Sequence, residues 1–330
     1  MSVKSHVLAV LEENKGKNVS GSKLADELSI SRNAVWKAIK ALQEEGYTIN
    51  AVTNKGYCLS DQNDILSEHS IRPYLSDRTK DLRIEVHKSV TSTNSLLKEL
   101  AASGEAEGKV LIAEEQSCGR GRMGRSFYSP EKTGIYMSIL LRPNVTVDDS
   151  LFITTAAAVA VARSIEKITA SSSTIKWVND IYCNDKKVCG ILTEAGIDFE
   201  GGGLEYAVLG IGINVGSPQG GFPDELKTIA AGIFDTNVYE SDVRSKLIAE
   251  VLNSFFDYYD NLHGKTFLEE YRNRSFLLGK EVNIITGKEI QQGLAYDIDD
   301  KARLLVKMPD GEIKVLSSGE VSVRPIQKTD

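Results

Sequence analysis

The 330-residue sequence contains few of the residues that usually build metal sites or disulfide frameworks. It has four cysteines and four histidines, and no two cysteines are spaced as a C-x-x-C pair. Structural zinc sites and redox dithiols depend on such close pairs. We therefore expect reduced thiols, with neither a zinc site nor a disulfide. The cysteines are Cys58, Cys118, Cys183 and Cys189.

A membrane-spanning segment is also missing from the sequence. The longest apolar stretch, 151–162, has twelve residues and includes two threonines, whereas a helix that crosses a bilayer needs about 20. We expect this stretch to form a buried helix. The first residues show neither a long apolar region nor a cleavage pattern, so no secretory signal is expected. These features predict a cytoplasmic protein.

The overall charge gives no preference for nucleic acid, because the formal net charge is −7 and the pI is near 5.4. The charge is unevenly distributed, however. Residues 1–60 carry eight Lys or Arg and six Asp or Glu, a net of +2, which leaves −9 for residues 61–330. The basic excess therefore lies at the N-terminus.

The first sixty residues predict three helices followed by a hairpin. Apolar residues recur there with the helical period. Ser20 and Ser31 are each placed to cap a following helix, and Gly46 suits the C′ position after the third one. An Asn-Lys-Gly turn at 54–56 then separates two short strands. This order predicts a winged helix-turn-helix domain over residues 1–64.

The third helix of this domain presents a polar outer face that suits DNA. Such a helix enters the major groove, where Arg and Asn reach base edges and Lys neutralises phosphates. We expect Trp36 to pack within the small domain rather than to contact bases. Winged domains also mediate protein contacts, and that alternative stays open. The candidate DNA-binding residues are Ser22, Ser31, Arg32, Asn33, Lys37, Lys40 and Lys55.

Three glycines are interleaved with three arginines in the segment 119–125, Gly-Arg-Gly-Arg-Met-Gly-Arg. Glycine lets a backbone approach a ligand closely, and guanidinium groups offer paired donors to carboxylate or phosphate oxygens. The spacing also fits a dinucleotide-binding loop, but a strand pattern at 134–141 follows where that loop requires a helix. A P-loop is excluded for the same reason, because it too requires a helix directly after the loop. A kinase glycine-rich loop does lie between strands, but the other kinase motifs are absent from the sequence. The segment indicates a site for a negatively charged substrate, with a solvated basic connection as the alternative.

Three further segments carry candidate site residues. Residues 91–94, Thr-Ser-Thr-Asn, precede an apolar helix and are placed to cap it, and a helix N-terminus also suits a polar ligand. Lys187 is predicted at the start of the second strand of a hairpin. The strand at 206–215 contains Gly210 and Gly212, which indicate that another group approaches this strand closely.

Together these segments resemble the signature blocks of the biotin protein ligases. With the N-terminal domain, the chain is similar to the bifunctional ligases that also repress the biotin operon. Two positions depart from the usual pattern, since Val178 stands in place of a proline and Phe127 in place of a tryptophan. The matching blocks, in chain order, are Glu115-Gln116, Gly119–Arg125, Lys176–Asp180, Lys187–Gly190 and Gly210–Val215.

The resemblance implies a multi-domain α+β fold. A linker at 65–82 would follow the winged helix-turn-helix domain, and a ligase domain with a mixed sheet of the class II synthetase type would span 83–272. The remaining residues, 273–330, would form a small SH3-like β-barrel. Short strand patterns alternating with turns from about residue 276 independently fit such a barrel.

The activity that the resemblance implies is ATP-dependent and has two steps. Biotin reacts with ATP to give biotinyl-5′-AMP and pyrophosphate, and a lysine of a biotin carboxyl carrier protein then takes the biotinyl group. Mg²⁺ would accompany ATP, and no protein metal site is assigned. The matched biotin-binding positions are Ser92, Thr93, Asn94, Gln116, Arg120, Gly121, Arg122 and Lys187. The matched nucleotide-binding positions are Arg120, Arg122, Arg125, Phe127, Lys187, Asn214 and Phe222. The catalytic candidates are Lys187, Arg122 and Asp180.

The resemblance also implies binding partners, and two alternative functions stay open. Operator DNA requires a homodimer, which the adenylate would promote, and the Gly-rich stretch 216–221 would close over the adenylate as a mobile flap. Lipoate-protein ligases share the catalytic scaffold and are one alternative. A biotin-sensing winged-helix regulator without transferase activity is the other.

Overall fold

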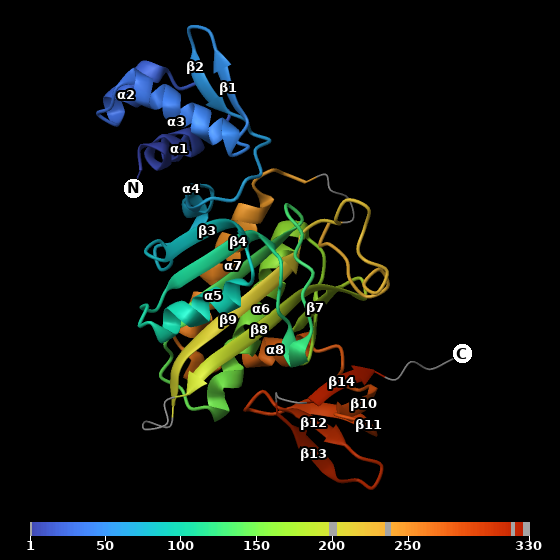
Figure 1. The fold of residues 1–330 in the computed structure, drawn as a ribbon. Coiled ribbons are helices and arrows are strands. Elements are labelled where there is room, and N and C mark those ends of the chain that lie inside the picture. The colour runs from blue at the N-terminus through green and yellow to red at the C-terminus, as the bar shows by residue number, and fades with distance from the viewer. Residues whose placement is uncertain (1, 198–202, 235–238, 318–320, 326–330) are drawn as a thin grey trace.

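The chain folds into three parts that follow one another along the sequence (Figure 1). In this computed structural model, the described residues are 2–197, 203–234, 239–317 and 321–325, with side chains described up to residue 317. The N-terminal part and the C-terminal sheet lie at opposite ends of a larger central part.

The N-terminal part has the predicted order of three helices and a hairpin. The Ser20 and Ser31 hydroxyls accept hydrogen bonds from the backbone N–H of Lys23 and Ala34, so both serines cap helices as expected. Gly46, with φ of 99°, ends the third helix. The elements are α1 (Val3–Glu13), α2 (Gly21–Glu27), α3 (Arg32–Glu44), β1 (Ile49–Val52) and β2 (Gly56–Leu59).

A seven-stranded mixed sheet forms the centre of the molecule. Its strand order is β3-β4-β5-β9-β8-β7-β6. The first pair is parallel, and every other neighbouring pair is antiparallel, as expected for a mixed sheet. The strands are β3 (Arg83–Val90), β4 (Lys109–Gln116), β5 (Gly134–Leu141), β6 (Thr174–Lys176), β7 (Asp180–Cys183), β8 (Lys186–Ile197) and β9 (Leu204–Asn214).

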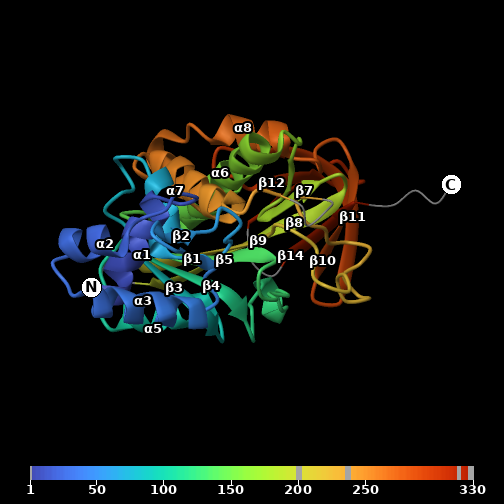
Figure 2. The ribbon, with the colours of Figure 1, turned by 90° about the horizontal axis from the view of Figure 1, so that it is seen from above.

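Helices cover both faces of this sheet (Figure 2). On one face lie α6 (Leu151–Thr169), α7 (Val243–Tyr259) and α8 (Leu268–Arg274), and on the other lies α5 (Thr93–Ala102). The apolar stretch 151–162 is buried in α6, as expected. No helix among the described residues is both long enough and apolar enough to cross a membrane. Short 3₁₀ turns lie at Arg122–Gly124, Asp148–Ser150 and Leu262–Gly264.

The C-terminal part is a five-stranded antiparallel sheet with the order β13-β12-β11-β10-β14. It contacts the central part at Trp177, whose indole N–H donates to the carbonyl of Ala302 at 3.1 Å. Closure of this sheet into an SH3-like barrel stays a prediction. The strands are β10 (Glu281–Thr286), β11 (Glu289–Ile298), β12 (Leu304–Lys307), β13 (Ile313–Leu316) and β14 (Val321–Pro325).

The segment 65–82, expected as a linker, packs into the central part. It holds the short helix α4 (Glu68–Ile71) and a 3₁₀ turn at Arg72–Tyr74. Leu66 and Ile71 are buried in the same apolar core as the central sheet. Its polar composition concealed the few apolar residues that fix it in place.

A buried arginine ties this segment to the sheet. Arg244 of α7 is fully buried and pairs with Asp64 at 3.1 Å and with Glu114 of β4 at 2.6 Å. Glu114 also accepts a hydrogen bond from the backbone N–H of Leu66 at 2.8 Å. One guanidinium thus satisfies two carboxylates that are mostly removed from water.

Arg244→Met should destabilise the protein strongly. The change leaves two carboxylates without their cation, and breaking a buried pair in this way costs about 3–5 kcal/mol. Thermal and urea unfolding measure the loss. Arg163→Met is the matched control because Arg163 pairs with Glu270 at the surface, where such pairs contribute about 0–1 kcal/mol.

The deficit of Arg244→Met should depend on pH. Burial raises the pKa of Asp64, and Arg244 opposes this rise. Without Arg244 the pKa of Asp64 rises further, so the folded variant binds a proton more tightly than its unfolded chain. The deficit should therefore be smaller near pH 4 and grow toward neutral pH, as Asp64 of the folded variant loses its proton without Arg244 beside it. An equal deficit at both ends of this range would contradict the assignment.

Candidate active site

The site lies against the α5 face of the central sheet, where two positions of one strand carry no side chain. Gly210 and Gly212 of β9 are two residues apart and therefore face the same side. A Cβ on Gly210 would lie 2.1 Å from Oδ1 of Asn94, and one on Gly212 would lie 2.6 Å from the Phe127 ring. The predicted close approach is confirmed, and the approaching groups are side chains of the site itself.

One end of the pocket is a hydrogen-bonded polar cluster at the N-terminus of α5. Ser92 caps the helix, as predicted. Thr93 donates to Oε1 of Gln116 from its backbone N–H at 2.9 Å, and the Gln116 amide donates to Ser129 at 2.9 Å. The hydroxyl of Ser138 on β5 contacts Thr93 and Asn94 at 2.7 and 2.6 Å. These side chains are fixed in position before any ligand arrives.

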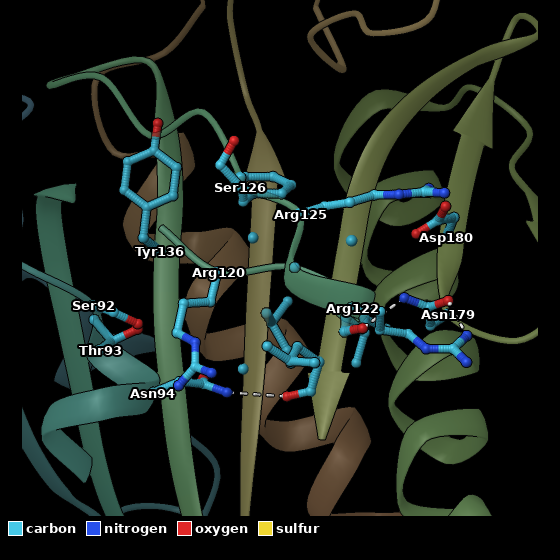
Figure 3. A pocket seen from close by; sticks show the side chains of 18 of the residues that line it. Ser92, Thr93, Asn94, Arg120, Arg122, Arg125, Ser126, Tyr136, Asn179 and Asp180 are labelled. Carbon is cyan, nitrogen blue, oxygen red and sulfur yellow. Dashed lines mark hydrogen bonds between the residues drawn. The ribbon is translucent and has the colours of Figure 1, made fainter. Parts of the chain in front are cut away.

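Arg120 reaches toward this polar end (Figure 3). Its guanidinium lies 3.3 Å from Oε1 of Glu194, which also binds the ammonium group of Lys98 at 2.9 Å. The other carboxylate oxygen of Glu194 accepts from the amide of Asn94 at 3.0 Å. Burial raises the pKa of Glu194, but the bonds from Lys98 and Asn94 outweigh it, and the pKa lies below its ordinary value. Glu194 is thus an anion that holds three groups of the site.

Arg122 is directed to the opposite end. Its guanidinium donates to Oδ1 of Asn179 at 3.1 Å, and Asn179 is held in turn by the carbonyl of Ile191 at 2.7 Å. Burial lowers the pKa of Arg122, and the nearby Asp180 opposes this shift. A half-buried guanidinium interacts strongly with an anion because little water screens it.

Lys187 and Asp180 form an ion pair with an N–O distance of 2.7 Å. Lys187 is the second residue of β8, at the root of the second strand of the β7–β8 hairpin as predicted, and its backbone binds Ile229 and Ala231. Figure 3 shows Asn179 and Asp180 at the end of the pocket opposite to Ser92, Thr93 and Asn94. The cation of Lys187 therefore lies where a ligand that reaches along the pocket would end.

A second cavity adjoins the first at this end. Asn214 and Phe222 line it, and Asn283 of β10 contributes from the C-terminal sheet. Phe222 is buried, whereas Phe127 is partly exposed between the two cavities. The residues that line both cavities are Arg125, Ser126, Phe127, Lys176, Asp180 and Lys187.

The structure brings together every residue expected at the ligand site. All positions expected to bind biotin line the first cavity. Of the seven expected nucleotide contacts, five line the second cavity, while Arg120 and Arg122 line only the first. The five are Arg125, Phe127, Lys187, Asn214 and Phe222.

Sequence reasoning missed several positions that hold these side chains. Ser138 interrupts the apolar pattern of β5, and Glu194 interrupts that of β8. Both interruptions were readable, because a polar residue in a buried strand needs a partner. Asn179 belonged to a matching block but carried no assigned role. Asn283 had no signal, since only the folded chain brings β10 to the site.

The candidate DNA-binding side chains lie on the outer side of the N-terminal part. Ser31, Arg32, Asn33, Lys37, Lys40 and Lys55 are exposed, and Ser22 is partly exposed. The expectation for Trp36 was wrong, because its side chain is 50% exposed. The inner face of α3 is filled by smaller apolar residues, namely Val35, Ala38, Ile39 and Leu42.

No group of three or more metal-binding side chains occurs among the described residues. Asp180 is the one carboxylate among the residues that line the two cavities. A divalent cation that kept its own waters and bound mainly to phosphates would need no more than this.

Comparison with protein families matches all three parts of the chain. Residues 86–214 match the biotin/lipoate A/B protein ligase family, and residues 3–58 match a helix-turn-helix domain. Residues 277–324 match the C-terminal domain of biotin protein ligases.

Two curated relatives align with this chain over nearly their whole length. The bifunctional ligase/repressor BirA of Bacillus subtilis is 36% identical over 91% of this chain and 92% of its own. The biotin–[acetyl-CoA-carboxylase] ligase of Mycobacterium tuberculosis is 32% identical over 78% of this chain and 95% of its own. Among solved structures, the Aquifex aeolicus biotin protein ligase in complex with biotin and ATP has a TM-score of 0.60. It is 28% identical and covers 74% of this chain and 99% of its own.

Gly212→Ala should destabilise the site through Phe127. The new methyl group would lie 2.6 Å from the ring, and such overpacking costs about 1–3 kcal/mol. In a Phe127→Ala background the methyl group has room, so the cost should vanish. Urea unfolding of the two single variants and the double variant measures the coupling. If the losses in unfolding free energy of the two single variants simply add in the double variant, contact with the Phe127 ring is not the reason that glycine is required at position 212.

Proposed function

The chain belongs to the biotin protein ligase family, in the form that carries an N-terminal helix-turn-helix domain, and from this membership we propose that it is both ligase and repressor. It activates biotin with ATP to biotinyl-5′-AMP and transfers the biotinyl group to a lysine of a biotin carboxyl carrier protein. It also represses transcription of genes for biotin synthesis or transport. Because its nucleotide, acceptor and DNA are intracellular, the proposal places it in the cytoplasm.

One observation carries the ligase proposal: two cavities meet at a shared set of cationic and aromatic residues. Biotin would occupy the cavity over Thr93, Asn94 and Gln116, with its carboxylate toward Lys187. ATP would occupy the cavity at Asn214 and Phe222. The two substrates would then meet at the end where Lys187 lies.

The first step must bring a carboxylate to a polyanion. The biotin carboxylate oxygen attacks the α-phosphorus of ATP, and the bond to the pyrophosphate oxygen breaks. Arg122 and Lys187 would reduce the repulsion and stabilise the negative charge that develops on phosphoryl oxygens. Mg²⁺, held mainly by the phosphates, would neutralise further charge.

The second step needs a neutral amine on the acceptor. The amine nitrogen attacks the carbonyl of the mixed anhydride, AMP leaves, and the amine loses a proton as the amide forms. An acceptor ammonium group has a pKa near 10.4 and is not nucleophilic. We propose that Asp180 accepts the proton that the acceptor amine loses. Its carboxylate is paired with Lys187 at 2.7 Å in the structure without ligand.

Incubation with ATP, biotin and a biotin carboxyl carrier domain tests the proposal. Pyrophosphate release together with a biotinylated lysine is the expected result. Transfer of lipoate in place of biotin would support a lipoate-protein ligase, and biotin binding without turnover would support a sensor. Retention of a biotin-operon duplex by the liganded protein tests repression.

Lys187→Met should slow pyrophosphate release by roughly 30- to 1000-fold, because one preorganised donor contributes about 2–4 kcal/mol to the transition state. Lys186→Met is the matched control. Lys186 neighbours Lys187 in the same strand but binds the backbone carbonyl of Thr228 at 2.6 Å, outside the residues that line the two cavities. Equal rates of pyrophosphate release for both variants would show that Lys187 does not contribute to the reaction.

We further propose that biotinyl-5′-AMP promotes a homodimer. Segment 119–125 lines the first cavity, and segment 216–221 directly precedes Phe222, which lines the second. A ligand that orders these loops would shift the protein toward a conformation in which they can pack against a second copy. With biotin and ATP, sedimentation should show dimerisation strengthened by about 5- to 150-fold, the usual range of such coupling. Lys187→Met, which forms little adenylate, should show no shift. Identical dimerisation constants with and without adenylate would refute the coupling.

A further inference from the structure

An indole lies exposed on α3, the helix that the proposed repressor function directs toward DNA. Half of the Trp36 side chain is exposed to solvent, at 50%. The core beneath α3 is complete without it. The residues of α3 that fill this core are Val35, Ala38, Ile39 and Leu42.

Trp36 lies at the centre of a cationic stripe. Arg32, Trp36 and Lys40 are spaced by four residues and so share one face of the helix. All three are exposed, and so are Asn33 and Lys37 beside them. The stripe therefore has cations at both ends and an apolar ring between them. Arg32 and Trp36 fall in the first half of α3 (Arg32–Glu44), the half that reaches the bases in such motifs.

The two kinds of side chain suit different parts of a duplex. Arg and Lys neutralise phosphates, which strengthens binding to any sequence. An indole carries no charge and only one N–H donor, so it gains little from phosphate. The C5-methyl of thymine is the apolar group on the base edges of the major groove, and apolar side chains recognise it by contact.

We propose that Trp36 is a base-reading residue, and that its indole packs against thymine methyl groups in the major groove of the operator. This inference rests on the proposed repressor function. The surrounding cations supply affinity and orientation, whereas Trp36 supplies part of the sequence preference.

Selection from a pool of randomised duplexes tests the assignment and finds the preferred binding sequence in the same experiment. The full-length protein, with biotin and ATP, should enrich a consensus that contains fixed thymines. Trp36→Ala should lose the preference at those thymines and keep it elsewhere. Lys37→Ala is the matched control, because a lost phosphate contact weakens binding to all sequences and lowers the salt slope by about 0.9.

Affinity for the selected consensus duplex gives the second measurement. Replacing the fixed thymines by uracil removes only the methyl groups, and this should weaken wild-type binding at least fivefold, within the usual range for a lost base contact, which is about 5- to 150-fold. Trp36→Ala should bind the thymine and uracil duplexes equally. Its binding to unselected duplex should stay within about twofold of wild type, because phosphate contacts dominate there.

Acrylamide quenching reports whether the indole itself is covered. Trp36 is one of two tryptophans, and the other, Trp177, is buried. Consensus duplex should protect the emission of the wild type and cause no protection in Trp36→Phe. Trp36→Ala should remain folded, since Ala favours a helix more than Trp does and the side chain is exposed. Circular dichroism checks this.

The outcomes separate the two proposals. If the wild type enriches no duplex, the repressor function itself fails. If it enriches a consensus and Trp36→Ala enriches the same one, DNA binding stands and the role of Trp36 is wrong. If Trp36→Ala instead weakens self-association in sedimentation and leaves the thymine preference intact, the indole serves an interface between copies, and the assignment to DNA is overturned.

Discussion

The candidate site depends on two positions of one strand that carry no side chain. Gly210 makes room for Asn94, and Gly212 makes room for Phe127. These two side chains come from segments far apart in the sequence, and they define the polar end of the first cavity and the boundary with the second. Any side chain on β9 at these positions would push them outward. The N-terminus of α5 and the segment that follows the glycine-arginine loop therefore both pack directly against the surface of the sheet at β9.

Before ligands bind, two cations of the site are already paired with carboxylates of the chain. Lys187 pairs with Asp180, and Arg120 pairs with Glu194. These carboxylates limit the repulsion between neighbouring cations and keep their side chains oriented. An entering anion exchanges with a carboxylate instead of meeting a free charge, so net attraction is lower than the number of cations suggests.

The sequence predicted those parts of the structure that depend on local signals. Serine caps and the positive-φ glycine after α3 follow from short-range sterics and hydrogen bonding. The strand at β9 was indicated by its apolar run, and its two glycines indicated a close approach. The missed features depend on burial, which one sequence does not display. Trp36 lies outside because smaller residues already fill the core, and Asn283 reaches the site only through packing of the C-terminal sheet. The polar segment 65–82 belongs to the central core through a few apolar side chains.

A continuous series of hydrogen bonds and ion pairs connects the N-terminal part to the ligand site. Asn63 accepts bonds from Lys15 and from the backbone of Thr48, both in the N-terminal part. The next residue, Asp64, binds the buried Arg244, which also binds Glu114. Glu114 belongs to β4, the strand that ends at the Gln116 of the ligand pocket. In this structure the N-terminal part is therefore held, through Asn63, Asp64 and Arg244, against the same strand that carries a residue of the pocket.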